Sequence, residues 1–364
     1  MPQGTRNRNE VTKMCNIAGY VGTKDAAPIL IEMIRRQEGF AGGYYTGIAT
    51  LHEGKIYYAK LTGTADRLVS LTDAAKLPGK IGIIHSRSKS GGGDEWAHPF
   101  IGWDRQSGNA RIAYIANGSK GIFKSRAAEA DAIAQRLFDE GYRMDSRVRG
   151  VSDRYTTLSD GTQVHMSDVM CQYILENMDG GLDSPAAFER AYCTMPAELV
   201  GLLLDVDQPD CIVWSRLNCP LHLGFTSHGA YLSSTPMGFS EDPDVKAAIP
   251  MPHASAGRVF ANRFEAKKYD DQPAKVGALY ADRVFEAYGN VLKTLGEGEK
   301  TFSELCKEAV APVFGKVRCR QTPMLCYEVL EAMYKRKLLN IESREIPGEF
   351  PDIPAVKFYL SLNK

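Results

Sequence analysis

Short β-rich runs, bounded by glycine or by polar turns, fill most of the first two thirds of the chain. Runs of this length that are rich in β-branched and aromatic residues predict β-strands. The predicted strands span residues 15–21, 47–51, 55–61, 80–86 and 111–116 in a first group, and 197–206, 211–217, 221–225, 230–233 and 258–264 in a second.

Helical patterns interrupt these runs. Residues 26–36 place apolar side chains along one stripe, and residues 184–195 predict a further helix. Between them, Ser167 is a suitable N-cap for a helix that continues to residue 178. Strands, a helical block and then more strands indicate an α+β fold, in which helices pack on antiparallel sheets.

The pattern changes after residue 267, and residues 268–274 are the predicted boundary of a second region. From residue 275 to 364 the chain is mainly helical, and we expect a small helical C-terminal module with a winged-helix-like arrangement. Its predicted elements are helices over 276–295, 302–310 and 323–339 and a terminal strand over 356–362. Acidic and basic residues are nearly balanced in this region, so nucleic-acid binding is not favoured.

The overall composition is that of a globular protein, with 44% hydrophobic and 24% charged residues among 364. The formal net charge of +0 gives no reason to expect a nucleic-acid partner. No apolar run approaches the roughly 20 residues that a membrane span requires. The 8 cysteines form no C-x-x-C pair. We therefore expect a cytoplasmic protein with reduced thiols and with no metal or cofactor; the sequence allows a homo-oligomer without indicating one.

One cysteine is unusual in its position. Cys15 directly follows Met14 and opens the first predicted strand. A thiol needs a base, because its unperturbed pKa of about 8.5 leaves little thiolate at neutral pH. The α-amino group of the same residue, with a pKa of about 7.7–8.0, serves if Cys15 begins the mature chain. Residues 1–14 are then a short propeptide or a mis-assigned start; the alternative is an inert buried cysteine.

Several motifs accompany this cysteine in a fixed order. They are C-N-I-A-G-Y-V-G (15–22), I-L-I-E-M-I-R-R-Q-E (29–38), G-I-I-H-S-R (82–87), A-H-P-F (97–100), I-A-N-G (115–118) and M-S-D (166–168). Together they resemble the glutaminase domain of class II glutamine amidotransferases, and in particular the glutaminase half of glucosamine-6-phosphate synthase (glutamine–fructose-6-phosphate aminotransferase). The resemblance covers about residues 15–265 and implies a four-layer α/β/β/α N-terminal-nucleophile fold over residues 15–267. The isomerase domains of that enzyme have no counterpart here.

The resemblance implies catalytic roles for three residues. Cys15 is the expected nucleophile. Asn117 and Gly118 are the expected oxyanion hole, because a side-chain amide and an unobstructed backbone N–H can stabilise the charge of a tetrahedral intermediate. Taken alone, the Asn-Gly pair is equally typical of a hairpin turn.

Substrate binding is expected from three further residues. Arg87 would clamp the α-carboxylate of glutamine, Asp168 would pair with its α-ammonium group, and Ser90 aligns with a hydroxyl that touches the substrate. A strand-end arginine and a helix-start aspartate are otherwise commonly a solvated charge and a cap. His85 and His98 are interpreted as structural, because the mechanism requires no imidazole.

Four positions depart from the family pattern. Asn16 stands where glycine usually follows the nucleophile, Ala41 replaces an arginine, Tyr44 an aspartate, and Ser88 a tryptophan. These changes leave the nucleophile in place, but they affect residues next to the expected substrate site.

Three functions remain open at this point. The first is a glutaminase that releases ammonia from L-glutamine through a Cys15 thioester, for an unidentified acceptor, which a partner protein could carry. The second is a retired amidotransferase fold that acts as a binding or regulatory protein. The third is an amide hydrolase for a substrate other than glutamine.

Overall fold

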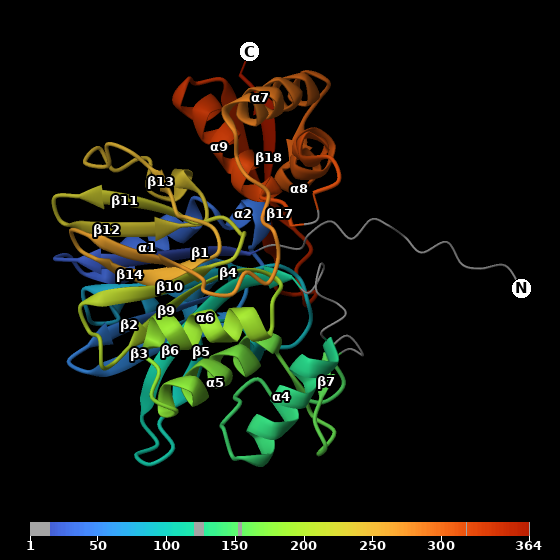
Figure 1. Cartoon of the computed structure of the whole chain (residues 1–364). Coiled ribbons are helices and arrows are strands. Elements are labelled where there is room, and N and C mark those ends of the chain that lie inside the picture. The colour runs from blue at the N-terminus through green and yellow to red at the C-terminus, as the bar shows by residue number, and fades with distance from the viewer. Residues whose placement is uncertain (1–14, 120–126, 152–154, 318, 364) are drawn as a thin grey trace, which may run out of the picture.

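The computed structural model describes residues 15–119, 127–151, 155–317 and 319–363, and two antiparallel sheets form its centre (Figure 1). The first sheet contains, from edge to edge, β13 (Ile249–Pro250), β11 (His222–Thr226), β12 (Gly229–Ser233), β1 (Asn16–Gly22), β4 (Ile81–Arg87), β2 (Tyr45–His52) and β3 (Lys55–Thr62). The second contains β15 (Phe264–Lys268), β14 (Ser255–Phe260), β10 (Cys211–Arg216), β9 (Glu198–Asp205), β6 (Ala110–Ser119) and β5 (Phe100–Trp103). A separate two-stranded hairpin pairs β7 (Thr156–Thr157) with β8 (Gln163–Val164).

The two sheets pack face to face through apolar side chains. Ile17 and Ile83 of the first sheet share a buried cluster with Ile115, Leu202 and Trp214 of the second. Alternation along each strand sends these residues inward and their neighbours to the opposite face. This inner layer holds β1, and therefore the residue before it, in the middle of the molecule.

Helices cover both outer faces of the sheet pair. On the first sheet lie α1 (Ala26–Arg35) and α3 (Ala65–Leu71), whose apolar residues share a cluster with those of β1 and β4. On the second lie α5 (Met166–Asp179) and α6 (Ser184–Thr194), and α4 (Ala127–Asp139) packs on α5. The helix–sheet–sheet–helix order is the four-layer arrangement that the resemblance implies.

The C-terminal module lies at the end of the sheets where α2 (Glu38–Ala41) is found (Figure 1). It consists of α7 (Ala281–Gly296), β16 (Lys300–Thr301), α8 (Phe302–Leu305), a π-helical turn (Cys306–Val310), a 3₁₀ turn (Ala311–Phe314), α9 (Thr322–Lys335), β17 (Leu339–Ile346) and β18 (Ala355–Leu362). Its strands pair in the order β16-β18-β17. The module therefore combines helices with a three-stranded antiparallel sheet, and its winged-helix-like arrangement stays a prediction.

The module shares its core with the N-terminal unit. Phe40 of α2 meets the rings of Phe302, Tyr327 and Phe358 edge-on, with centroids 5.9, 5.7 and 5.0 Å away. A Cβ on Gly39 would lie 2.2 Å from the ring of Phe358, so this approach requires glycine. The two parts are therefore packed as one body at α2.

Several sequence-based expectations need correction. The cap of α5 is His165, whose Nδ1 accepts a hydrogen bond from the backbone N–H of Ser167, so Ser167 is not the N-cap. The tail contains more strand than expected, because the predicted helix over 323–339 ends at Lys335 and β17 follows. Lys337 adopts a φ of 57°, which breaks the helical path between them. The sequence patterns did not predict α4. The predicted strand over 258–264 covers the end of β14, the turn at 261–263 and the first residue of β15.

Candidate active site

Cys15 lies immediately before β1 and is tied to β6 of the opposite sheet. Its backbone N–H donates to Oδ1 of Asn117 at 2.9 Å, and its carbonyl accepts from Nδ2 of Asn117 at 2.7 Å. Both ends of one side-chain amide therefore hold the two main-chain polar groups of the cysteine. The pair is buried, so it fixes the position of Cys15 relative to β6.

The thiol of Cys15 points toward the end of β4. Its Sγ lies 3.9 Å from Oγ of Ser88, the residue that follows Arg87. Burial raises the pKa of the Cys15 thiol above its ordinary value, while hydrogen bonding to Ser88 and the charge of Arg87 oppose that rise. A thiol in this position requires a proton acceptor to become a nucleophile.

Asn117 and Gly118 are part of a regular strand. They pair with Val200 and Leu199 of β9 within the long ladder between β6 and β9, so the hairpin-turn alternative for this Asn-Gly pair is wrong. Gly118 is exposed, and its backbone is unobstructed by a side chain. The amide nitrogen of Asn117 is engaged by Cys15, so an oxyanion role for that side chain requires it to share or exchange this bond.

Arg87 is buried rather than solvated, with a relative exposure of 2%. Its guanidinium lies over the ring of Tyr45, 4.6 Å from the centroid, and 5.7 Å from that of Trp96. Nη1 donates to the carbonyls of Trp96 at 2.9 Å and Gly91 at 3.3 Å. Among the described residues Nη2 has no hydrogen-bond partner, which leaves one charged donor for an anion.

Asp168 lies in the interior at the start of α5. Its Oδ2 accepts from the backbone N–H and the hydroxyl of Ser146, at 2.9 and 2.8 Å, and its Oδ1 accepts from Gln172 at 3.0 Å. Burial raises the pKa of Asp168, and these hydrogen bonds oppose the rise. The structure places this carboxylate in a filled network, so pairing with a substrate ammonium group stays a prediction that requires these bonds to rearrange.

Ser90 lies in the loop between β4 and β5. Its hydroxyl donates to the carbonyl of Ser88 at 3.1 Å. Its backbone N–H, and that of Gly91, both donate to Oε2 of Glu349 at 3.2 Å. A carboxylate from the C-terminal module therefore lies on the loop expected to bind substrate, a contact that the sequence reasoning missed.

His85 and His98 are stacked in the interior, with ring centroids 3.8 Å apart. Nε2 of His85 lies 2.9 Å from the carbonyl oxygen of Ala116, next to Asn117. Burial lowers the pKa of His85 to about 3 and that of His98 well below its usual range. Both rings are therefore neutral at physiological pH, as a structural role requires.

Asn16 connects the nucleophile segment to the C-terminal module. Its Nδ2 donates to the hydroxyl of Tyr327 at 3.0 Å, and its Oδ1 accepts from the backbone N–H of Ala41 at 3.2 Å. Glycine, which the family usually has here, could make neither bond. This departure was the only sequence signal of the contact.

The other three departures surround one pocket. Ala41, Tyr44 and Ser88 line an open pocket of about 190 Å³, together with residues of the module such as Phe302 and Lys357. Small side chains at positions 41 and 88 leave this space open. Because Ser88 also approaches the Cys15 thiol, the pocket adjoins the nucleophile.

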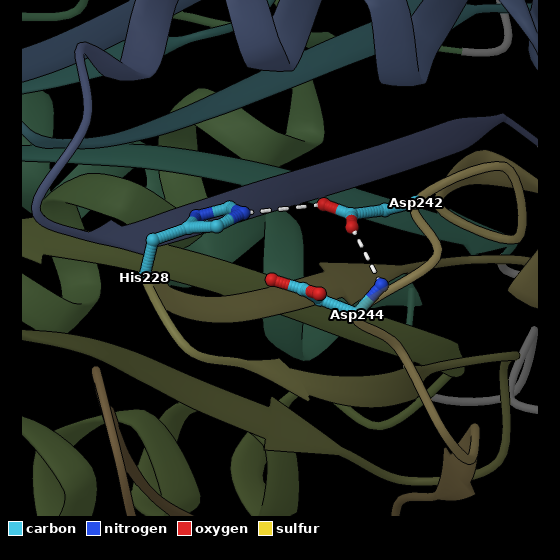
Figure 2. Close-up of side chains that lie close together, drawn as sticks. All are labelled: His228, Asp242 and Asp244. Carbon is cyan, nitrogen blue, oxygen red and sulfur yellow. Dashed lines mark hydrogen bonds and ion pairs between the residues drawn. The ribbon is translucent and has the colours of Figure 1, made fainter.

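A separate cluster of possible ligand groups lies where the turn between β11 and β12 meets the segment between β12 and β13 (Figure 2). Nε2 of His228 is 3.2 Å from Oδ2 of Asp242, which also accepts from the hydroxyl of Tyr231 at 2.8 Å. Oδ1 of Asp242 accepts from the backbone N–H of Asp244, and Oδ2 of Asp244 from Ser227. These groups are paired with one another and fix the loop, so the cluster is explained without a ligand.

The helices that the structure describes include none with both the length and the apolar composition to cross a bilayer. Residues 1–14, expected to be a propeptide or a mis-assigned start, lie outside the described residues.

Comparison with known proteins finds sequence relatives over part of this chain. No family model matches the chain. A glutamine–fructose-6-phosphate aminotransferase of Pyrococcus horikoshii is 42% identical over 227 residues, which is 61% of this chain and 32% of that enzyme. The enzyme of the same name from Zymomonas mobilis is 26% identical over 223 residues, again 61% of this chain and 32% of the relative. The chain thus spans about one third of the length of these relatives.

Solved structures agree on the fold. The glutamine phosphoribosylpyrophosphate amidotransferase of B. subtilis matches with a TM-score of 0.57 and 15% identity, over 78% of this chain and 58% of that chain. The predicted resemblance to class II glutamine amidotransferases is confirmed. The relatives carry the names of enzymes, and the solved amidotransferase shares the fold of this chain.

Proposed function

We propose that this protein is a class II glutaminase that releases ammonia from L-glutamine through a thioester on Cys15. The observation that carries the proposal is the position of Cys15 before β1, with both main-chain groups bonded to Asn117, in a chain related to glutamine amidotransferases.

In the proposed reaction, the Cys15 sulfur attacks the side-chain amide carbon of glutamine. The α-amino group of Cys15 takes the thiol proton and later gives it to the leaving ammonia. The Gly118 N–H, with the Asn117 amide, would stabilise the oxyanion. Water then hydrolyses the thioester to glutamate and restores the thiol.

This mechanism requires Cys15 to be the first residue of the mature protein, because an amide nitrogen does not accept a proton at neutral pH. Arg87 would bind the α-carboxylate of glutamine through Nη2, which has no hydrogen-bond partner in the described part of the chain. Ammonia would leave past Ser88 into the adjoining pocket, on the way to an acceptor held by the C-terminal module or by a partner protein.

Glutamate release from glutamine tests the proposal, with wild type, Cys15→Ala and Cys193→Ala as the matched cysteine control on α6. We expect release by wild type and by the control, and only background release by Cys15→Ala. Intact-mass analysis of the active protein should show a chain that begins at Cys15. Equal background in all three proteins, or full activity with residues 1–14 attached, would refute the mechanism.

A second candidate is a retired amidotransferase fold with a binding or regulatory role. One observation favours it: burial raises the pKa of the Cys15 thiol, and the nearby Asn117 amide is already engaged. A glutamine-like electrophile distinguishes the two, since stoichiometric labelling of Cys15 is expected only of an active glutaminase.

A further inference from the structure

The loop between β17 and β18 reaches the proposed substrate site from the C-terminal module. Oε2 of Glu349 accepts hydrogen bonds from the backbone N–H groups of Ser90 and Gly91, both at 3.2 Å. Nζ of Lys89 donates to the carbonyl of Gly348 at 3.0 Å. A Cβ on Gly348 would lie 1.8 Å from the carbonyl oxygen of Ile353, so the loop is tightly folded where it presents Glu349.

The backbone groups that bind the Glu349 carboxylate form a site suited to an anion. Two successive backbone N–H groups converge on one oxygen, and Gly91 and Gly92 adopt φ values of 89° and 81°, which glycine tolerates best. Concave arrangements of successive N–H groups bind anions in many proteins. Gly91 also contacts Arg87: its carbonyl oxygen accepts a hydrogen bond from Nη1 of the buried arginine.

Arg87 provides an independent indication that an anion belongs here. It is 2% exposed, and its Nη2 has no hydrogen-bond partner among the described residues. Tyr45 lies beneath the guanidinium. Burial raises the pKa of Tyr45, the charge of Arg87 opposes that rise, and the nearby Glu349 carboxylate adds to it. A carboxylate and an incompletely paired arginine thus lie around one aromatic ring.

We propose that Glu349 occupies the subsite for the α-carboxylate of the substrate, so that the C-terminal module competes with glutamine for its own active site. This inference rests on the proposed function and adds a residue that controls access and specificity. Two carboxylates cannot use the same pair of N–H donors, because like charges in contact repel. Glutamine must therefore displace the Glu349 loop, and a carboxylate-free molecule would not need to.

The expected size of the effect follows from the fraction of molecules in which the subsite is free. If that fraction is about one tenth, the apparent affinity for glutamine is about tenfold weaker than that of the open site. Because Glu349 is attached to the same chain, dilution does not relieve the competition.

The test compares Glu349→Gln and Glu349→Ala with Glu345→Gln, which removes a carboxylate from an exposed position of β17 in the same hairpin. We expect the KM for glutamine to fall about tenfold in both Glu349 variants and to be unchanged in the Glu345 variant. A KM that is unchanged or raised in the Glu349 variants would overturn the proposal; a raised KM would mean that Glu349 recognises the substrate.

Binding of L-glutamate, measured by calorimetry in the Cys15→Ala background, keeps the test independent of catalysis. Glutamate carries the same α-carboxylate, so it should bind more tightly when Glu349 is replaced. Acetamide lacks that group, so its affinity should be equal with and without Glu349. Equal glutamate affinities would refute competition even if the protein has no glutaminase activity. Conversely, an inactive wild type with tighter glutamate binding in Glu349→Ala would refute the glutaminase and retain the carboxylate subsite.

Discussion

The N-terminal unit and the C-terminal module contribute to the candidate site in different ways. The N-terminal unit holds Cys15 through continuous strand ladders and through Asn117, on a strand of the facing sheet. The module reaches the site through single side chains, Tyr327 on Asn16 and Glu349 on the loop after Arg87. The first arrangement fixes a nucleophile, and the second can be released without unfolding the sheets.

The N-terminal unit is therefore suited to hold the catalytic residue, and the C-terminal module to control entry of substrate. Strand ladders and interdigitated sheet faces allow little movement, so the geometry around Cys15 is set by the sandwich core. Two or three side-chain hydrogen bonds, each with a net contribution of about 0.5–1.5 kcal/mol, can break and reform when a substrate arrives. The module is therefore suited to respond to substrate or partner, provided that its shared core at Phe40 stays intact.

Breaking the shared core should have the largest effect on stability. Phe40→Ala removes a buried ring at the junction, and Phe188→Ala removes one from the sandwich. Each should lower the free energy of unfolding by about 3–5 kcal/mol, measured by denaturant titration. Only Phe40→Ala should also increase proteolysis between β15 and α7; equal proteolysis of both variants would show that the junction does not depend on Phe40.

A substitution at Asn117 tests whether the N-terminal unit fixes the nucleophile. Asn117→Ala removes a proposed oxyanion donor and the clamp on Cys15, so kcat for glutamine hydrolysis should fall about 10²- to 10³-fold. Asn109→Ala, at an exposed position before the same strand, should leave kcat unchanged. A decrease of less than fivefold in a folded Asn117 variant would exclude this role.

Glu38 makes the stability of the junction depend on pH. Burial raises the pKa of Glu38 to about 8 in the folded protein, although the backbone N–H of Ala65 hydrogen-bonds its carboxyl group. The unfolded chain loses this proton near pH 4.3. Stability from this group is therefore complete below about pH 4 and is lost as pH rises toward 8.

Glu38→Gln should remove that part of the pH dependence. Between pH 5 and 8, the urea midpoint of wild type should fall relative to that of the variant, by an amount on the order of 2 kcal/mol in free energy. Glu32→Gln, at an exposed position of α1, is the control. Parallel pH profiles for wild type and Glu38→Gln would show that Glu38 is ionised in both states.

The smallest expected effect concerns the link between Asn16 and Tyr327. A double-mutant cycle with Asn16→Ala and Tyr327→Phe should give a coupling energy of about 1 kcal/mol, the ordinary net value of a buried hydrogen bond. Glutamine turnover should change little in Tyr327→Phe, because the strand ladder holds Cys15 by itself. A large loss of kcat in that variant would mean that the module takes part in positioning the nucleophile.

Much of the sandwich was predictable from local pattern. Residues 15–21 and 26–36 read as a strand and a helix because side-chain periodicity and turn residues are local properties, and β1 and α1 lie there. Cys15 was identifiable from its place before the first strand and from the motifs that follow. The Asn-Gly pair at 117–118 was ambiguous, because only pairing with β9 decides between strand and turn.

Local sequence patterns predicted most of the sandwich elements in order, the candidate nucleophile and the resemblance to class II glutamine amidotransferases. The tertiary structure alone decided what lies on the site: Tyr327 meets Asn16 across 311 positions, and Glu349 meets Ser90 across 259. It also decided that Asp168 faces a filled interior network. No local pattern encodes such contacts, because they depend on how two packed units bring distant backbone donors and side chains within 3.5 Å of each other.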